Sequence, residues 1–344
     1  MVSIPAELPA YLDQNADRFL SELKDLLRIP SVSTLPAHRP DMERAHAFLA
    51  EQMRAMGMEN IQRLLPKERP QGEPLLYADW LHAPGAPTLL FYGHYDVQPP
   101  DPLSEWLTPP FEPTVRDGNL YARGASDDKG QVFAQVKAVQ AWMQTSGRLP
   151  VNVKFLLEGE EEVGGEGVEL YVRQHHDALA CDCAVVSDTA FFAPGLPSLD
   201  VGLRGMVYAE IEVQGPSRDL HSGMYGGVAP NPFEALARII VGLKSVEGKI
   251  LIPGFYDHVQ PPNAAELEAW KRLPFDENAY REQELGSAAL TGEQQYSVLE
   301  RTWARPTLEV HGMPGGFTGP GSKTVIPAHA SAKISMRLVP DQRP

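Results

Sequence analysis

Two residues that could bind a metal ion follow the most apolar short run of the chain. The segment LLFYGHYDVQPP, residues 89–100, places His94 and Asp96 two positions apart at the end of a predicted strand. Because side chains i and i+2 of a strand point to the same side, the imidazole and the carboxylate face one way where the strand leaves the core. This pair fits either a hydrogen-bonded surface turn or the first part of a metal site.

Further acidic residues stand at comparable positions, each after an apolar strand or in a turn beside one. Asp127 and Asp128 lie in the loop YARGASDDKG, three glutamates end the segment KFLLEGEEE, and Asp188 follows AVVS. In an open α/β sheet the ligand crevice lies at the carboxyl ends of the strands. These side chains are therefore expected to converge on one crevice.

Each carboxylate also has an ordinary structural explanation when it is considered alone. Asp127 or Asp128 suits a helix N-cap, the glutamate run suits a solvated face, and Asp188 suits a turn. Considered together, like charges aimed at one crevice repel each other unless a cation lies between them, and a mixed histidine and carboxylate set suits zinc or a related divalent metal. Of two adjacent glutamates, one can bind the metal while its neighbour accepts a proton from water. Asp96 can hydrogen-bond the ring nitrogen of His94 that faces away from the metal.

Helices and strands are expected to alternate over the first 200 residues. The hydrophobic periodicity predicts helices over 15–28, 41–57, 128–145 and 168–175 and strands over 88–97, 151–162 and 183–188. Unbroken apolar runs in the strands favour a mostly parallel sheet that is covered by helices on both faces. We therefore predict an α/β catalytic domain over residues 1–199.

The pattern changes near residue 200. The segment GMVYAEIEVQG alternates apolar and polar residues, which is typical of a strand with one solvated face. A helical segment, NPFEALARIIVGLKSV, and a second alternating segment, TVIPAHASAKISMRLVP, follow it. We predict a smaller α+β lid or dimerisation domain over residues 200–344.

Composition disfavours several classes of protein. The chain has 30 Lys and Arg against 45 Asp and Glu, a net charge of −15, which argues against nucleic-acid binding. It has no apolar run long enough to span a membrane and no secretory signal at its N-terminus. Its two cysteines, Cys181 and Cys183, stand one residue apart and are interpreted as buried thiols rather than as a disulfide or half of a zinc site. These features predict a cytoplasmic protein.

Several motifs resemble those of one enzyme family. GHYDVQP, LYARGASDDKG, LLEGEEEVGG and VVSD are similar to motifs of the co-catalytic zinc aminopeptidase-like enzymes, in the branch that contains cytosolic nonspecific dipeptidase and carnosinase. DLHSGMYGG and SKTVIPAHASAKISMRLVP resemble the second domain of the same branch. The resemblance runs from about residue 15 to the end. It implies a dinuclear metallopeptidase that hydrolyses dipeptides, with two Zn²⁺ per subunit, or Mn²⁺ or Co²⁺ in their place, and a homodimer formed through the second domain.

The resemblance also implies roles for individual residues of the first domain. His94 and Asp188 correspond to ligands of one zinc ion, and Asp127 corresponds to the carboxylate that bridges both ions. Glu162 corresponds to a ligand of the second ion, and Asp96 corresponds to the residue that orients the histidine.

The remaining roles concern catalysis and substrate binding. Aligning EGEEEVGG on the family pattern EGxEExGG implies Glu161 as the general base and leaves Glu160 at the variable position. His221 matches a histidine that reaches the active site of the neighbouring subunit to polarise the scissile carbonyl. Arg337 matches an arginine that holds the substrate carboxylate, and Thr324 lies near the same carboxylate in the family pattern.

One element of the family pattern is missing from this sequence. Family members supply a further histidine ligand to the second zinc ion from a C-terminal segment, and neither His311 nor His329 matches it. We interpret the sequence as a truncated chain, and we expect it to bind the second ion weakly, which would impair the activity of the chain as printed.

Two other functions are compatible with the motifs. One is an N-acyl-amino-acid deacylase, of the acetylornithine or succinyl-diaminopimelate type, because the metal motifs alone do not distinguish a peptide from an acyl amide. The other is a metal-binding or dimer-forming scaffold without activity, suggested by the absent ligand. Dipeptides or N-acyl amino acids are the expected partners, with no nucleic acid and no membrane.

Overall fold

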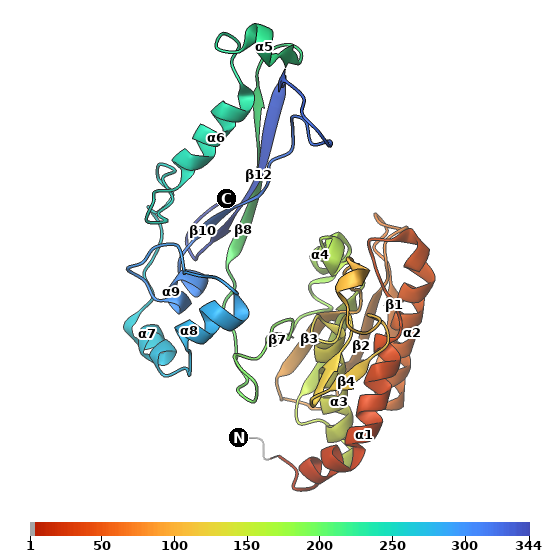
Figure 1. The fold of residues 1–344 in the computed structure, drawn as a ribbon. Helices are drawn as coiled ribbons and strands as arrows, with labels where there is room; N and C mark the ends of the chain where they lie inside the picture. The colour runs from red at the N-terminus through yellow and green to blue at the C-terminus, as the bar shows by residue number, and fades with distance from the viewer. Residues whose placement is uncertain (1–3) are drawn as a thin grey trace. The chain divides into compact units, whose positions relative to one another are not determined.

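The computed structural model describes residues 4–344 of the chain (Figure 1). Two compact units divide these residues, one ending at Leu199 and the other beginning at Asp200. No helix among the described residues is both long and apolar enough to cross a lipid bilayer.

The helices of the N-terminal unit bury one apolar stripe each. In α2, buried side chains recur at Met42, Ala45, Leu49 and Met53, the three- and four-residue spacing of one helix face. Helix α3 ends at Gly147, whose positive φ of 66° allows its N–H to bond the Met143 carbonyl. The helical elements of this unit are α1 (Glu7–Leu27), η1 (Pro36–His38), α2 (Arg39–Ala55), η2 (Leu103–Glu105), α3 (Lys129–Ser146), η3 (Glu161–Val163) and α4 (Glu166–His175).

A five-stranded sheet lies between these helices in the order β1-β2-β6-β3-β7. Strands β6, β3 and β7 run parallel, whereas β2 pairs antiparallel with both β1 and β6. A small separate hairpin follows β3 in the chain. The strands are β1 (Glu59–Leu64), β2 (Leu75–Trp80), β3 (Thr88–His94), β4 (Thr114–Arg116), β5 (Asn119–Tyr121), β6 (Asn152–Glu158) and β7 (Cys183–Val186).

The α/β class predicted from the sequence is confirmed, but the sheet is mixed rather than mostly parallel. The difference comes from β1 and β2, neither of which we predicted. The loop 65–74 that joins them is too short to hold a helical crossover, so the second strand returns antiparallel to the first. Every residue of β2 is buried, whereas β1 is largely exposed at the edge of the sheet.

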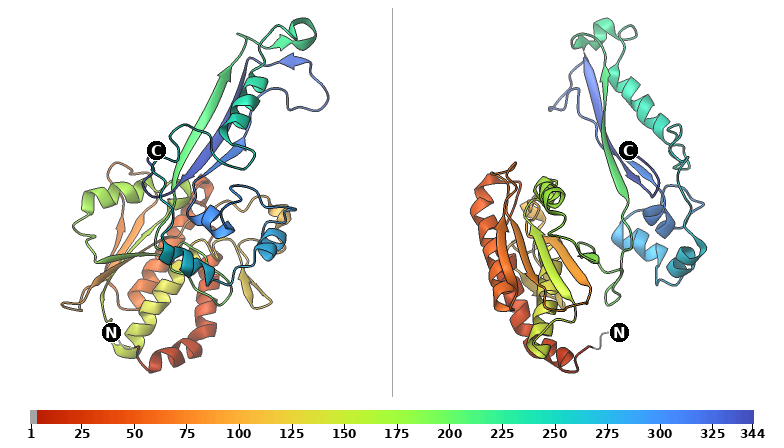
Figure 2. Two further views of the ribbon diagram at one scale, coloured as in Figure 1. Left: turned by 90° about the vertical axis from the view of Figure 1, so that its left-hand side faces the viewer. Right: turned by 180° about the vertical axis from the view of Figure 1, so that it is seen from behind.

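Helices cover both faces of this sheet (Figures 1 and 2). On one face, α2 and α3 pack on alternate residues of the central strands, such as Ala78 and Phe155. On the other face, Tyr171 of α4 packs near Tyr77 and Leu156. The parallel strands therefore have rigid surroundings, and their carboxyl ends can hold side chains in fixed positions.

The C-terminal unit has a three-stranded antiparallel sheet with the order β10-β12-β8. Helix α6 packs on one face through Leu236, against Ala330 and Ala332, and exposed residues alternate with partly buried ones along β8. The elements are β8 (Gly205–Gln214), β9 (Leu220–His221), α5 (Ser222–Tyr225), α6 (Pro232–Leu243), α7 (Ala264–Lys271), α8 (Glu277–Ala279), η4 (Tyr280–Glu284), α9 (Val298–Trp303), β10 (Thr307–Gly312), β11 (Val325–Ile326) and β12 (His329–Leu338).

The interpretation of the two cysteines as buried thiols was wrong. Cys181 and Cys183 are both free and exposed. They precede and begin β7, which pairs only with β3 among the described strands and is exposed along most of its length.

Candidate metal centre

The centre of the candidate site is His94, the last residue of β3, whose side chain is fully buried. The preceding residue, Gly93, lets the start of α3 approach the strand closely. A Cβ atom at this position would lie 2.4 Å from Val132 Cγ2 and 2.6 Å from Asp128 Oδ2. The absence of a side chain at Gly93 therefore allows the loop before α3 to lie against the histidine.

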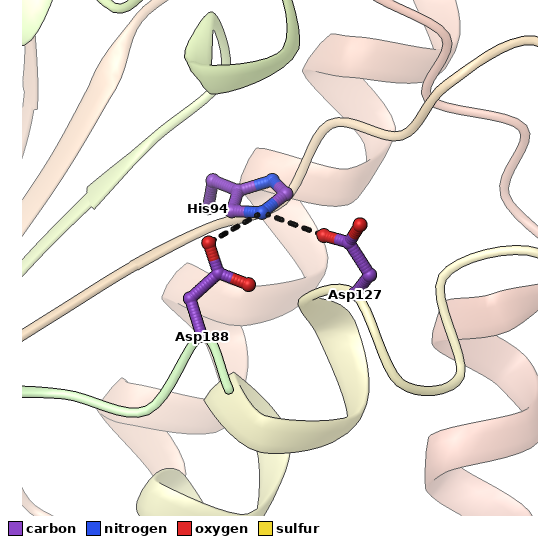
Figure 3. Close-up of side chains that lie close together, drawn as sticks. All are labelled: His94, Asp127 and Asp188. Carbon is purple, nitrogen blue, oxygen red and sulfur yellow. Dashed lines mark hydrogen bonds and ion pairs between the residues drawn. The ribbon is translucent and has the colours of Figure 1, made fainter. Parts of the chain in front are cut away.

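Two carboxylates from separate loops face the outer ring nitrogen of His94 (Figure 3). Nε2 lies 3.1 Å from Oδ1 of Asp127, which precedes α3, and 3.7 Å from Oδ2 of Asp188, which follows β7. One ligand atom from each of the three residues lies within 4.8 Å of the others. One imidazole and two carboxylates at this spacing can hold a divalent metal ion, and a nitrogen and oxygen donor set suits zinc.

Asp96 faces the other ring nitrogen of His94. Nδ1 lies 3.1 Å from the Asp96 carbonyl oxygen and 3.3 Å from its carboxylate Oδ1. The second carboxylate oxygen accepts hydrogen bonds from Ser33 Oγ, at 2.7 Å, and from the backbone N–H of Glu162, at 3.1 Å. The carbonyl and carboxylate oxygens of Asp96 favour a proton on Nδ1, so Nε2 is the ring nitrogen that would bind a metal ion beside the two aspartates.

The three consecutive glutamates have different surroundings. Glu160 is buried and forms an ion pair at 2.8 Å with Arg69. The Glu160 carboxylate is therefore directed at the loop before β2, which carries Arg69. Glu162 accepts a hydrogen bond from Gln98 Nε2 at 2.7 Å and is not one of the three clustered ligands. The side chain of Glu161 forms no hydrogen bond or ion pair within residues 4–344 and lies in the electrostatic field of the cluster.

Negative charge dominates this pocket. Burial raises the pKa of Glu161, of Glu162 and of Asp188, and the charge of Asp127 raises each of them further. Burial opposes protonation of His94, but the hydrogen bond and charge of Asp96 outweigh it and raise the pKa of the imidazole to about 10. Protonation of His94 and of the carboxyl groups is thus favoured in the absence of another cation. A divalent ion would supply the same neutralisation.

Sequence reasoning assigned no role in the site to several residues that support this pocket. Asp128 is buried, accepts a hydrogen bond from the backbone N–H of His94 at 3.1 Å, and has a pKa that burial raises to about 7. Glu158 ends β6 directly opposite His94 in the parallel register, and Tyr92 donates a 2.5 Å hydrogen bond to it. Its position at a strand end was a usable signal, whereas Ser33 lies in a loop with no pattern of its own.

The predicted substrate-binding residues all lie in the C-terminal unit. The backbones of β9 and β11 pair at His221, where Nε2 lies 3.1 Å from Thr324 Oγ1 and Nδ1 accepts a 3.1 Å hydrogen bond from the N–H of Gly223. Arg337 lies eight residues beyond His329 along β12, about 27 Å at the rise of a strand. The structure brings Thr324 to His221, whereas Arg337 lies near the far end of β12.

Comparison with known proteins gives consistent matches. The model of peptidase family M20/M25/M40 matches residues 90–319. The chain is 35% identical over 357 residues to Beta-Ala-His dipeptidase of Homo sapiens, covering 99% of this chain and 70% of that protein. It is 35% identical over 342 residues to Cys-Gly metallodipeptidase dug1 of Schizosaccharomyces pombe, covering 96% and 71%. The M20 family metallo-carboxypeptidase Sso-CP2 from Sulfolobus solfataricus has a similar structure, with a TM-score of 0.81 at 35% identity, covering 95% and 72%.

Proposed function

Since the chain belongs to peptidase family M20/M25/M40, we infer that it is a metal-dependent hydrolase of dipeptides. Both curated relatives described above are named as dipeptidases, which supports this substrate class. The observation that carries the inference is the convergence of His94, Asp127 and Asp188 on one point from three separate segments. Such a concentration of carboxylates suits a bound cation better than it suits a packed core.

The donor set fits a divalent metal ion, and zinc in particular. His94 Nε2 and one oxygen from each of Asp127 and Asp188 would hold the first ion. We propose that Asp127, the most exposed of the three, is shared with a second ion that Glu162 would also bind. A metal ion there would act as a Lewis acid and lower the pKa of a water molecule.

Glu161 is the residue best suited to move the proton. It lies beside the cluster, its own side chain has no competing partner among the described residues, and burial raises its pKa. A raised pKa makes its carboxylate a better acceptor of the proton from the attacking water, and the acid so formed would deliver that proton to the leaving amine. Glu160 is unsuited to this role because its carboxylate pairs with Arg69.

His221 is proposed to polarise the carbonyl of the scissile bond. Because Nδ1 accepts from Gly223, the proton lies on Nε2, which donates to Thr324 Oγ1 and could donate to a carbonyl oxygen instead. We propose that it acts in the site of a neighbouring subunit of a homodimer and that Thr324 accompanies it. Arg337 would bind the carboxylate of the substrate through its planar guanidinium.

Mixing two inactive variants tests this arrangement. Dimers that contain both His221→Ala and Glu161→Ala subunits should recover part of the activity, because one of the two sites then has every residue. No recovery after full subunit exchange would contradict a shared site. It would not contradict the proposed metal centre, which lies within one subunit.

A substrate panel tests the proposed reaction. Dipeptides, including Cys-Gly and β-Ala-His, should be hydrolysed in preference to acetyl- and succinyl-amino acids, and chelation should abolish turnover. Faster hydrolysis of the acyl amino acids would identify a deacylase. One zinc ion or none, without turnover of either class, would identify an inactive scaffold. A cytoplasmic location is proposed because two exposed free cysteines suit a reducing compartment.

A further inference from the structure

Two arginines that form no ion pair within residues 4–344 lie at one end of the three-stranded sheet in the C-terminal unit. Arg337 of β12 pairs in register with Met206 of β8 and with Thr307 of β10. Arg204 directly precedes β8, whose first residue, Gly205, pairs with Leu338, so Arg204 lies beside the end of β12 that carries Arg337. Residues this close along paired strands are within reach of each other's long side chains.

Arg337 lies on the face of the sheet that α6 leaves open. The side chains that contact α6, such as Ala330 and Ala332, alternate along β12 with those on the Arg337 face. Arg337 is exposed and Arg204 is half-buried. Arg204 and Arg337 thus lie close together at this end of the sheet, and Thr307 pairs with Arg337 from the neighbouring strand.

Neither guanidinium group is neutralised within residues 4–344. Nη1 of Arg204 is buried and has no hydrogen-bond partner, and no ion pair is formed by Arg204 or by Arg337. Burial and the charge of Arg337 both lower the pKa of Arg204. Glu309, two residues along β10 from Thr307, is paired with Lys244 at 3.2 Å.

Arg305 shows how an arginine of this unit is ordinarily satisfied. It forms two parallel hydrogen bonds with Glu293, both 2.8 Å long, and it is also half-buried. Arg204 and Arg337 have no acidic partner of this kind within the described residues. Their two positive charges repel each other, and one anion between them would satisfy both. Planar guanidinium groups bind carboxylates in a two-pronged geometry.

We propose that Arg204 is a second binding residue for the C-terminal carboxylate of the substrate, placed beside Arg337. The proposal deepens the proposed dipeptidase function and rests on it for the identity of the anion. Two arginines on one carboxylate would make the enzyme selective for peptides with a free C-terminus. Peptide amides and esters, which carry no negative charge at that end, would lose most of this interaction.

The test compares a dipeptide with its C-terminal amide, which has the same scissile bond. The dipeptide is the one that the panel shows to be hydrolysed fastest. In the full chain, Arg204→Met should lower kcat/KM for the free dipeptide by about 10- to 100-fold, mainly through KM, as expected for loss of a charged hydrogen bond. The same variant should change kcat/KM for the amide by less than about twofold, and Arg204→Lys should restore part of the loss.

A matched control and a binding measurement separate the possible outcomes. Arg238→Met removes an exposed arginine of α6 and should leave the ratio of the two substrates unchanged. Calorimetric binding of the dipeptide and of its amide to the Glu161→Gln protein, with and without Arg204→Met, measures the subsite without turnover. If the wild type hydrolyses no dipeptide but still binds the free carboxylate through Arg204, the dipeptidase function fails and the anion site stands. An equal loss for both substrates, or no loss for either, would overturn the role of Arg204.

Discussion

Replacing Gly93 with alanine should impair the metal centre without altering any residue proposed to bind metal or substrate. The new Cβ atom would lie 2.4 Å from Val132 Cγ2 and 2.6 Å from Asp128 Oδ2. Ordinary contacts of this kind are about 3.5–4 Å long, so strand and helix must separate by about 1 Å. Neither neighbour is the free end of a flexible chain, because Val132 and Asp128 are both buried.

The expected effects follow from that displacement. Overpacking of a buried site costs about 1–3 kcal/mol, which corresponds to a fall of about 2–12 °C in the thermal midpoint for a unit of this size. Because Asp127 is carried on the same loop, it would move relative to His94, and a 1 Å misplacement can reduce catalytic efficiency about 100-fold. Zinc affinity should fall together with kcat/KM.

Thermal unfolding, zinc titration and dipeptide turnover would be measured on the same variants. Combining Gly93→Ala with Val132→Ala removes the shorter clash and should recover part of the lost activity. Gly242→Ala is the control, since a Cβ atom there meets nothing within 4 Å and the residue lies in helix α6. A Gly93→Ala protein with wild-type stability, zinc affinity and turnover would refute the claim that this close approach positions the site.

Two further predictions concern catalysis and pH. Glu161→Gln should lower kcat by about 10²- to 10⁴-fold with unchanged zinc content. Glu160→Gln should keep most turnover but lower the thermal midpoint, because it breaks the ion pair with Arg69. Equal losses of kcat in the two variants would contradict the assignment of Glu161 as the general base. His46 is buried, and burial lowers its pKa below 6.5, so the unfolded chain binds a proton that the folded chain does not. The free energy of unfolding, measured by urea denaturation at several pH values, should therefore decrease as the pH falls below about 6.5. This decrease should be smaller in His46→Gln. If the free energy of unfolding depends on pH equally in both proteins, His46 is not a source of the dependence.

The strands that sequence patterns indicated are those with a clear run or alternation of apolar residues, and complete burial did not decide the matter, since β2 is fully buried and was not predicted. Strands β3 and β6 are continuous apolar runs and were expected. Strand β1 escaped notice because ENIQRL is mostly polar and lies exposed at the edge of the sheet. Without β1 and β2 the antiparallel half of the sheet was missed, since pairing direction depends on loop length and on tertiary contacts.

The candidate site was more accessible to sequence reasoning than the groups around it. His94 and Asp188 stand at strand ends, where the parallel part of the sheet directs them to one edge. Ser33 and Arg69 contact Asp96 and Glu160 across more than sixty positions of sequence, and no local pattern marks such contacts.

Anomalous diffraction at the zinc edge, from crystals grown with zinc, would locate the metal ions in the chain. We expect a peak about 2.0–2.2 Å from His94 Nε2 and from one oxygen each of Asp127 and Asp188. A second peak between Asp127 and Glu162 is expected at saturating zinc. Zinc peaks only elsewhere in the chain, or none at all while these three side chains stay in place, would contradict a metal centre here and the hydrolase built on it.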